Sequence, residues 1–441
     1  MPPLRELATE VARRLSARGH RALFAGGCVR DFLLGREPKD FDIATSARPE
    51  QVLEVYPHAV LVGIQFGVVR VHHRGEEFEV ATFRREGAYL DGRRPSEVTF
   101  TGEREDAQRR DFTINGMFLD PATGEVIDHV GGRADLAARV IRAIGDARAR
   151  FSEDHLRLVR AIRFAAGLGF ALDPATQEAI REMAPLVATV SAERVRDEVW
   201  KLLSGPDPRR GLELLDATGL LAHILPEVEA TKGVPQPPEF HPEGDVWTHT
   251  LLVMGSLERP TADLAVAALL HDIGKPKTLV VADRIRFDRH AEVGAEMAEE
   301  VCRRLKCPTA ETETVTALVR DHMKFMNVRE MKASTLKRFL REPHFEALLA
   351  LHKADCLGCH RDLTNWTYCV EKREEFARHQ EPLRPKPLVT GHDLIAEGYP
   401  PGPRFGEILT VVEDAQLEGT LTTREQALAF VRERFPQEGG A

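Results

Sequence analysis

Apolar residues repeat at helical spacing from the start of the chain. They fall on one face of an amphipathic helix at Leu4, Leu7, Ala8, Val11, Ala12 and Leu15. A short apolar run over 22–25 then stops at Gly26-Gly27, which predicts a strand followed by a helix from Cys28 to Leu34. Further strands are predicted over 41–45, 60–71 and 78–83, with bends at Gly63 and Gly67.

The pattern becomes mostly helical after about Arg142. Proline-rich segments at 235–238 and 382–387 predict turns or boundaries between domains. We therefore expect an α+β protein, with a mixed sheet and helices in the head and all-helical regions after it. The expected domains are a head over 1–142, a helical neck over 143–232, a third domain over 233–381 and a helical tail over 382–441.

Composition narrows the class of protein. The chain has 441 residues, of which 43% are hydrophobic, so it can bury several cores and is not disordered throughout. Six cysteines in this length do not make a disulfide framework. We find neither a signal peptide nor an uncharged apolar run of about 18 residues, so we expect a cytoplasmic protein without membrane contact. The net charge of −9 means that an RNA partner needs a local basic surface.

The first candidate site contains two aspartates around Phe41. On a strand, Asp40 and Asp42 project to the same face, and two adjacent like charges are costly without a cation between them. Carboxylate oxygens suit Mg²⁺, and a pair of such ions can assist phosphoryl transfer. Alone, the motif strongly favours two solvated acids at the start of a strand. Glu79, on a later predicted strand, is either a third metal-binding carboxylate or an ordinary strand acid.

Neighbouring residues favour a phosphate ligand. Gly26 and Gly27 lead into the helix that carries Arg30, and glycines let backbone amides approach a phosphate closely. Arg30 can add a charge-assisted contact. Two arginines precede an aspartate in the segment Arg109-Arg110-Asp111-Phe112-Thr113-Ile114-Asn115. They could form a surface ion pair or could contact the phosphate and ribose of a nucleotide. The pair of candidate metal-binding aspartates in the same domain favours nucleotide contacts.

These segments resemble, in order, the head of class II tRNA nucleotidyltransferases and bacterial poly(A) polymerases, within the polymerase-β-like nucleotidyltransferase superfamily. The resemblance covers the first half of the chain and is carried by residues 26–31, 40–42, 109–115, 128–136, 141–142 and 153–157, by Arg160, Arg163 and Phe164, and by Glu193, Arg194 and Glu198. Gly116 is a small departure, because the family commonly has alanine there.

The resemblance implies template-independent addition of CMP and AMP, from CTP and ATP, to the 3′ end of tRNA. It implies catalytic Asp40, Asp42 and Glu79 with Mg²⁺ on the two aspartates, and no role for DNA. The nucleotide-binding residues that it implies are Gly26, Gly27, Arg30, Arg110, Asp111, Asn115, Asp154, Arg157, Arg160 and Arg163, with Glu153, Asp154 and Arg157 selecting the base.

Asp154 and Arg157 could select nucleotides without a nucleic-acid template. We expect them as i,i+3 neighbours on one helix, where both can face one ligand. Adenine and cytosine each present an exocyclic amine beside a ring-nitrogen acceptor, which matches an aspartate and an arginine. Guanine and uracil would leave buried groups unpaired. The alternative is a simple salt bridge on a solvated helix. Arg157, Arg160 and Arg163 also predict a basic stripe for a triphosphate or RNA.

A second candidate site consists of histidines and aspartates in the later half. The ordered series His249, His271-Asp272, His290, His322 and Asp355 resembles the HD phosphohydrolase superfamily. Residues 240–245 also resemble the HD domain of many bacterial CCA-adding enzymes. The resemblance implies that His249, His271, Asp272 and Asp355 hold a first metal, Mn, Ni, Co, Fe or Mg. His290 and His322 then serve a second metal or the substrate phosphate. It also implies 2′,3′-cyclic phosphodiesterase, 2′-nucleotidase or phosphatase activity.

Three alternatives remain from the sequence. A relative restricted to CC addition, A addition or poly(A) synthesis shares the head motifs. Signalling hydrolases and protein uridylyltransferases also join such a head to an HD domain, although residues 109–115 and 153–157 argue against them. Cys356, Cys359 and Cys369 could form a zinc site, but with a single Cys-x-x-Cys pair we favour buried thiols.

Overall fold

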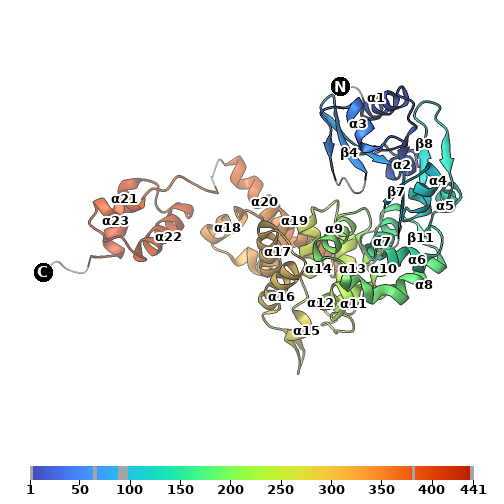
Figure 1. Ribbon diagram of the computed structural model, residues 1–441. Helices are drawn as coiled ribbons and strands as arrows, with labels where there is room; N and C mark the ends of the chain where they lie inside the picture. The colour runs from blue at the N-terminus through green and yellow to red at the C-terminus, as the bar shows by residue number, and fades with distance from the viewer. Residues whose placement is uncertain (1–2, 63–66, 88–97, 380–382, 438–441) are drawn as a thin grey trace. The chain divides into compact units, whose positions relative to one another are not determined.

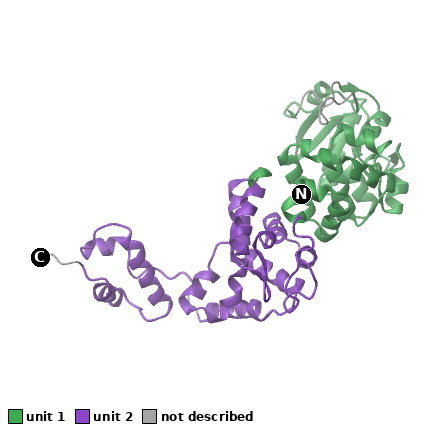
Figure 2. Ribbon diagram, turned by 90° about the horizontal axis from the view of Figure 1, so that it is seen from below, with its two compact units in different colours: residues 1–229, 303–307 green, residues 230–302, 308–441 purple. Residues whose placement is uncertain are grey.

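The computed structural model describes residues 3–62, 67–87, 98–379 and 383–437. The chain divides into two compact units, the first made of residues 1–229 and 303–307 and the second of 230–302 and 308–441 (Figure 2). The four-domain division expected from the sequence is finer than this one and stays a prediction. Its tail boundary, at residues 381 and 382, lies outside the described residues.

A seven-stranded sheet forms the head within the described residues (Figure 1). The strand order is β3-β4-β5-β2-β1-β8-β9, and β2 pairs with β5 in parallel while the other neighbours are antiparallel. The strands are β1 (Ala22–Ala25), β2 (Asp42–Thr45), β3 (Val60–Leu61), β4 (Val68–His73), β5 (Glu76–Thr82), β8 (Met117–Leu119) and β9 (Val126–Asp128). A separate antiparallel pair joins β6 (Arg84–Glu86) and β7 (Val98–Phe100).

Helices cover the sheet with the apolar faces that the sequence predicts. The first helix, α1 (Leu4–Ser16), buries Leu7, Ala8, Val11, Ala12 and Leu15 and packs against β1 and α3 (Pro49–Val55). Burial of such a face supplies most of the stability of a helix of this length. The other head helices are α2 (Gly27–Leu33), α4 (Glu103–Gln108), η2 (Thr113–Asn115) and α5 (Gly132–Ala138).

The rest of the first unit is mainly helical. Its central helix, α7 (Leu156–Leu168), packs against both α9 (Ala192–Leu203) and α10 (Pro208–Ala217). The remaining elements are α6 (Ala147–Glu153), α8 (Pro174–Met183), η3 (Ala184–Thr189), α11 (Leu220–Ile224) and α12 (Pro226–Glu229). A short parallel pair, β10 (Val140–Ile141) with β11 (Ala171–Leu172), contacts α7 and departs from the all-helical expectation.

The second unit is also mainly helical. Its elements up to residue 379 are α13 (Val246–Ser256), α14 (Ala262–Leu270), α15 (Lys275–Thr278), the hairpin β12 (Leu279–Val281) and β13 (Ile285–Phe287), α16 (His290–Arg304), α17 (Thr309–Asp321), η4 (His322–Glu330), α18 (Ala333–Leu340), α19 (Phe345–Gly358) and α20 (Thr364–Arg378). The hairpin is another departure from the all-helical expectation.

The last three helices have their own apolar core. They are α21 (Gly391–Ala396), α22 (Arg404–Leu417) and α23 (Arg424–Arg434), and the core includes Leu394, Tyr399, Ile408, Val412 and Val431. Helix α22 contacts α18, where Lys337 donates to the Leu417 carbonyl at 3.0 Å.

The sequence predicted most elements of the head, with shifted boundaries. The strand expected over 41–45 begins at Asp42, so Asp40 lies two residues before it. The strand expected over 60–71 is β3 and β4, and the predicted bend at Gly63 lies outside the described residues. The bend at Gly67 is confirmed by its positive φ of 67°. In the described part of the chain, no helix combines the length and the apolar character needed to cross a membrane.

Candidate functional site

Only Asp42 of the two aspartates lies on the strand, beside a third carboxylate, so the strand face that the sequence predicts for both aspartates is not present at Asp40. Asp42 begins β2 opposite Ala25, the last residue of β1. Ile43 pairs with Val80 of β5, so Glu79 is the neighbour of Asp42 on the adjacent strand. Surrounding protein and the charges of Asp40 and Glu79 raise the pKa of Asp42 to about 6. This mutual repulsion among hard oxygen donors is what a divalent cation would relieve, so the residues fit Mg²⁺.

The raised pKa of Asp42 predicts an effect on stability. The folded-state pKa of about 6 lies above the usual 3.8, so ionising Asp42 destabilises the metal-free protein as pH rises through this window. Asp42→Asn is therefore expected to raise the melting temperature in EDTA at pH 8 and to have no effect below pH 4. We expect the free energy of unfolding to rise by about 1 kcal/mol at most, because Asp42 is exposed and solvent screens its charge. Thermal melts from pH 4 to 8 test this, and a gain independent of pH would contradict it.

Glu79 is an exposed carboxylate on β5. Its side chain is 57% exposed and lies 3.9 Å from Arg70. Its charge acts on Asp42, but it does not line the pocket described below. A role as third metal-binding carboxylate stays a prediction.

The turn after β1 brings backbone close to the arginines of the site. Gly26 has φ of 74°, and a Cβ there would lie 3.1 Å from Nη1 of Arg110 and 3.9 Å from Oδ2 of Asp42. A side chain at Gly26 would thus be strained and would crowd the space between the acids and Arg110. Arg110 is itself held by Asp106, 3.0 Å away and 1% exposed, so the ion pair in this segment is with a buried acid.

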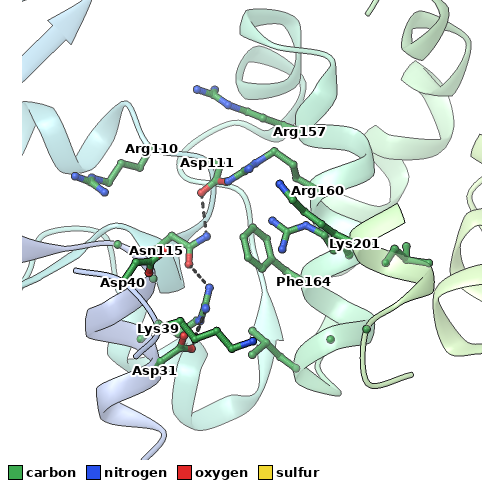
Figure 3. A pocket seen from close by; sticks show the side chains of 18 of the residues that line it. Asp31, Lys39, Asp40, Arg110, Asp111, Asn115, Arg157, Arg160, Phe164 and Lys201 are labelled. Carbon is green, nitrogen blue, oxygen red and sulfur yellow. Dashed lines mark hydrogen bonds and ion pairs between the residues drawn. The ribbon is translucent and has the colours of Figure 1, made fainter. Parts of the chain in front are cut away.

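A chain of hydrogen bonds ties the head to α7 (Figure 3). Arg30 donates to Oδ1 of Asn115 at 2.9 Å, and Asn115 donates to Asp111 at 3.2 Å. Arg160, on α7, donates to the other oxygen of Asp111 at 2.7 Å. Burial alone would raise the pKa of Asp111, but Arg160 and Asn115 outweigh it and lower the pKa. Asp111 therefore holds two neighbours in place, and direct nucleotide contact by Asp111 stays a prediction.

Asp154 and Arg157 do not lie on one helix, so the i,i+3 arrangement expected from the sequence is wrong. Asp154 has extended backbone between α6 and α7 and accepts the Leu156 N–H at 3.1 Å, which helps to begin α7. Its carboxylate pairs with Arg194 of α9 at 2.7 Å. Arg157 pairs with Glu153 and donates to the Arg150 carbonyl at 3.0 Å. Neither the expected shared helix face nor the simple salt bridge between them is present.

Acidic neighbours partly neutralise the row of arginines on α7. Arg160 and Arg163 both pair with Glu198 of α9, which is 5% exposed in its side chain. Three guanidinium groups also lie close to the Phe164 ring, those of Arg30, Arg160 and Arg163, at 5.3, 5.3 and 4.2 Å from its centre. Their charges are fixed in position by acids, so the free basic stripe expected from the sequence is only partly present.

A pocket of about 960 Å³ collects most of these residues (Figure 3). Ten basic and seven acidic residues line it, so it is locally positive in a chain of net charge −9. The predicted residues in its wall are Gly26, Gly27, Arg30, Asp40, Asp42, Arg110, Asp111, Asn115, Asp154, Arg157, Arg160 and Arg163. Glu153 does not line it but contacts Arg157.

Several pocket residues were missed by the sequence reasoning. They are Arg36, Glu37, Lys39, Lys201 and Asp207. Asp31, Arg109 and Arg194 also line the pocket and lie in segments that carry the sequence resemblance. Arg194, Glu198 and Lys201 follow i, i+4, i+7 spacing on α9, so helical periodicity could have placed all three on one face.

The histidines and aspartates of the second unit converge as the sequence predicts. We call His249, His271, Asp272, His290, His322 and Asp355 the histidine cluster. Nε2 of His249 lies 3.0 Å from Asp355 and 3.3 Å from Nε2 of His271. Nε2 of His290 lies 3.3 Å from Nε2 of His322, and Asp272 lies between the two pairs, 3.2 Å from His271 and 3.6 Å from His290.

The cluster has the donor set of a metal centre. His271, His290 and His322 direct Nδ1 to the carbonyls of Ala268, Phe287 and Val319 at 2.7, 2.9 and 2.7 Å, which leaves Nε2 as the ligand atom. Burial lowers the pKa of His322 to about 3, so its imidazole stays neutral as metal ligation requires. Within the cluster the geometry gives two ligand groups, His249 with His271 and Asp355, and Asp272 with His290 and His322. A third group of possible ligands, His241 with Glu243 and His249, adjoins the cluster. Asp272 thus faces both groups rather than only the first.

The cysteines form no metal-ligating group among the described residues. Cys356 and Cys369 are buried and Cys359 is half-buried. Burial raises the pKa of each thiol to about 12, which makes them poor metal ligands and nucleophiles.

Comparison with known families and proteins gives consistent matches along the chain. Family models match residues 22–142 (poly A polymerase head domain), 169–232 ("Probable RNA and SrmB-binding site of polymerase A") and 289–431 (tRNA nucleotidyltransferase domain 2). The CCA-adding enzyme of Geobacillus stearothermophilus is 48% identical over 224 residues, 51% of this chain and 55% of that protein. The chain thus spans about half the length of this relative and of its Geobacillus counterparts.

Other matches extend over nearly the whole chain. The CCA-adding enzyme of Lactobacillus johnsonii is 30% identical over 97% of both chains. The crystal structure of the Bacillus stearothermophilus CCA-adding enzyme in complex with CTP has a TM-score of 0.76 and 30% identity, and the match covers 98% of this chain and 99% of that one. The Thermotoga maritima CCA-adding enzyme complexed with tRNA, at 19% identity and a TM-score of 0.59, shares the fold.

Proposed function

Because this chain belongs to the family of CCA-adding enzymes, we propose that it adds CMP and AMP, from CTP and ATP, to the 3′ end of tRNA in the cytoplasm. The observation that carries the proposal is the pocket itself. It joins a pair of aspartates fit for Mg²⁺, a set of arginines for phosphates, and the Asp154 and Arg157 side chains.

The reaction is a substitution at the α-phosphate of the incoming nucleotide. The tRNA 3′-hydroxyl attacks in line, and pyrophosphate leaves. Asp40 and Asp42 would hold Mg²⁺, which would supply positive charge to favour the alkoxide and to neutralise the triphosphate. Gly27, Arg30 and Arg110 line the same pocket and would contact phosphate or ribose. Arg30 is already oriented by Asn115 and by Asp31, 2.8 Å away, so little ordering is left to occur on binding.

The base is read by Asp154 and Arg157, each held by a different neighbour. Oδ2 of Asp154 accepts from Arg194 and keeps a further lone pair for an exocyclic amine. Glu153 and two backbone carbonyls fix Arg157, which has further N–H groups for a ring nitrogen. This pair matches adenine and cytosine and mismatches guanine and uracil.

Asp154→Ala is expected to relax nucleotide selection. Without the acceptor carboxylate, the relative kcat/KM for UTP and GTP against CTP and ATP should rise by about 10-fold or more. Steady-state incorporation of each nucleotide into tRNA measures this. The matched control is Asp197→Asn, on the exposed side of α9. An equal loss for all four nucleotides would contradict base reading by Asp154.

The extent of addition separates full CCA addition from narrower activities. The substrate is tRNA ending at the discriminator base, incubated with CTP, ATP or both. We expect products three nucleotides longer only with both nucleotides present. Products that end after two cytidines would indicate CC-adding activity. Extension only of tRNA that already ends in CC would indicate A-adding activity, and long A tails would indicate poly(A)-polymerase activity.

We propose a second activity, metal-dependent phosphohydrolysis, at the histidine cluster. The supporting observation is the convergence of four Nε2 atoms and two carboxylates in the second unit, from helices and from the turn after α14. A first-row divalent ion such as Mn, Ni, Co or Fe, or Mg, suits this donor set and can supply activated water. The substrates we expect are 2′,3′-cyclic phosphodiesters, 2′-nucleotides or other phosphomonoesters, as at damaged tRNA ends.

A further inference from the structure

A glutamate beside the histidine cluster joins two imidazoles. Glu243 lies in the loop before α13, and its side chain is 8% exposed. Its Oε1 accepts from Nδ1 of His241 and Nδ1 of His249, each at 2.9 Å. Its Oε2 is buried without a hydrogen-bond partner among the described residues.

His249 needs such a partner because of its place in α13. The other three cluster histidines direct Nδ1 to the carbonyl of the residue three positions earlier. His249 lies inside a helix, where the corresponding carbonyl, that of Val246, already accepts within α13 and from the Thr250 hydroxyl. An acceptor must therefore come from outside the helix, and Glu243 supplies it.

The loop is built to hold Glu243 in this position. Asp245 begins α13 by accepting the Thr248 N–H at 2.9 Å, and it also accepts the Gly233 N–H at 2.6 Å. Gly244, between the two acids, has φ of 120°, a backbone conformation that favours glycine. The helix cap thus fixes the chain two residues after Glu243.

We propose that Glu243 is a positioning residue of the histidine cluster, and this rests on the metal site proposed above. As an acceptor-only carboxylate it keeps the His249 proton on Nδ1, so that Nε2, 3.0 Å from Asp355 and 3.3 Å from His271, is a ligand atom. A carboxylate partner also makes the imidazole more basic than a carbonyl does, so His249 becomes a stronger ligand. His241 packs edge-on against His249, with ring centres 5.0 Å apart, and adds a second donor that fixes Glu243.

The test is metal affinity of the full chain, measured by calorimetry with Mn²⁺ and Co²⁺ in competition with a chelator. Glu243→Gln keeps the side-chain volume but removes the charge, and we expect the affinity to fall about 10- to 100-fold. The matched control is Glu239→Gln, the same change at an exposed position four residues earlier, with no expected effect. Glu243→Asp keeps the charge and should recover part of the affinity. The Co²⁺ absorption spectrum of the saturated Glu243→Gln variant should also change.

Each outcome addresses a separate claim. If the unaltered chain and the Glu239→Gln variant bind neither metal, the proposed metal site is wrong. If they bind and Glu243→Gln binds equally tightly with an unchanged Co²⁺ spectrum, the positioning role is wrong. A purely structural role would lower the melting temperature of the metal-free protein but leave metal affinity intact. If the Glu243→Gln variant fails to fold, the Glu243→Asp variant decides by the same measurements.

Discussion

Asp42→Asn is expected to lower the rate of CMP and AMP addition by about a thousandfold or more. The substitution keeps the size of the side chain but removes one of the two charges that we propose as Mg²⁺ ligands. Loss of several kcal/mol of transition-state charge stabilisation corresponds to this factor. Single-turnover extension of tRNA lacking its CCA end, at saturating CTP, measures the effect. Asp40→Asn should give a loss of similar size.

Two controls separate catalysis from folding. Asp197→Asn changes an exposed aspartate of the same unit and should retain full activity. The Asp42→Asn variant should be at least as heat-stable as the unaltered protein in EDTA, because the raised pKa of Asp42 means that its charged form destabilises the metal-free protein. Full-speed tRNA extension by either the Asp40→Asn or the Asp42→Asn variant would refute the proposed head chemistry.

Asp272→Asn is expected to abolish metal-dependent phosphohydrolysis and to leave nucleotide addition unchanged. Asp272 faces both ligand groups of the histidine cluster, so its loss weakens both. It also lies 2.7 Å from the buried Lys275, and the isosteric amide keeps that space filled. Hydrolysis of 2′,3′-cyclic AMP and of p-nitrophenyl phosphate with added Mn²⁺, Ni²⁺ or Co²⁺ measures the first effect, and tRNA extension measures the second.

The matched control for this variant is Asp283→Asn, an exposed acid of the β12–β13 hairpin. Parallel loss of hydrolysis and nucleotide addition in the Asp272→Asn variant would mean that the two activities do not use separate sites. Unchanged hydrolysis would mean that the cluster is not the hydrolytic centre.

The sequence was most informative where local pattern and chemistry coincide. The turn at Gly26-Gly27 and the aspartates around the start of β2 could be located because short-range periodicity and turn residues determine them. The histidine cluster could be predicted from the order of its residues, because His and Asp at separated positions on helices have few purely structural explanations.

Long-range partners could not be predicted in the same way. Asp154 pairs with Arg194, forty residues later, and this contact depends on how α9 packs against α7. The expectation of a shared helix for Asp154 and Arg157 failed because Asp154 serves instead to begin α7. The partners of His249 illustrate the opposite case, since Glu243 is close in sequence but only the hydrogen bonds reveal what it does.

Residues 303–307 belong to the first unit although the chain on both sides of them belongs to the second. Within that unit Arg304 donates to the Ile224 carbonyl at 2.8 Å and pairs with Glu227 at 2.7 Å, at the end of the helical neck. A fragment that stops at residue 229 would lose these contacts with Arg304. The Ile224 carbonyl and the Glu227 carboxylate would then be exposed to water. The two proposed activities can therefore be switched off one at a time by point mutation, whereas cutting the polypeptide between them would damage the half that is kept.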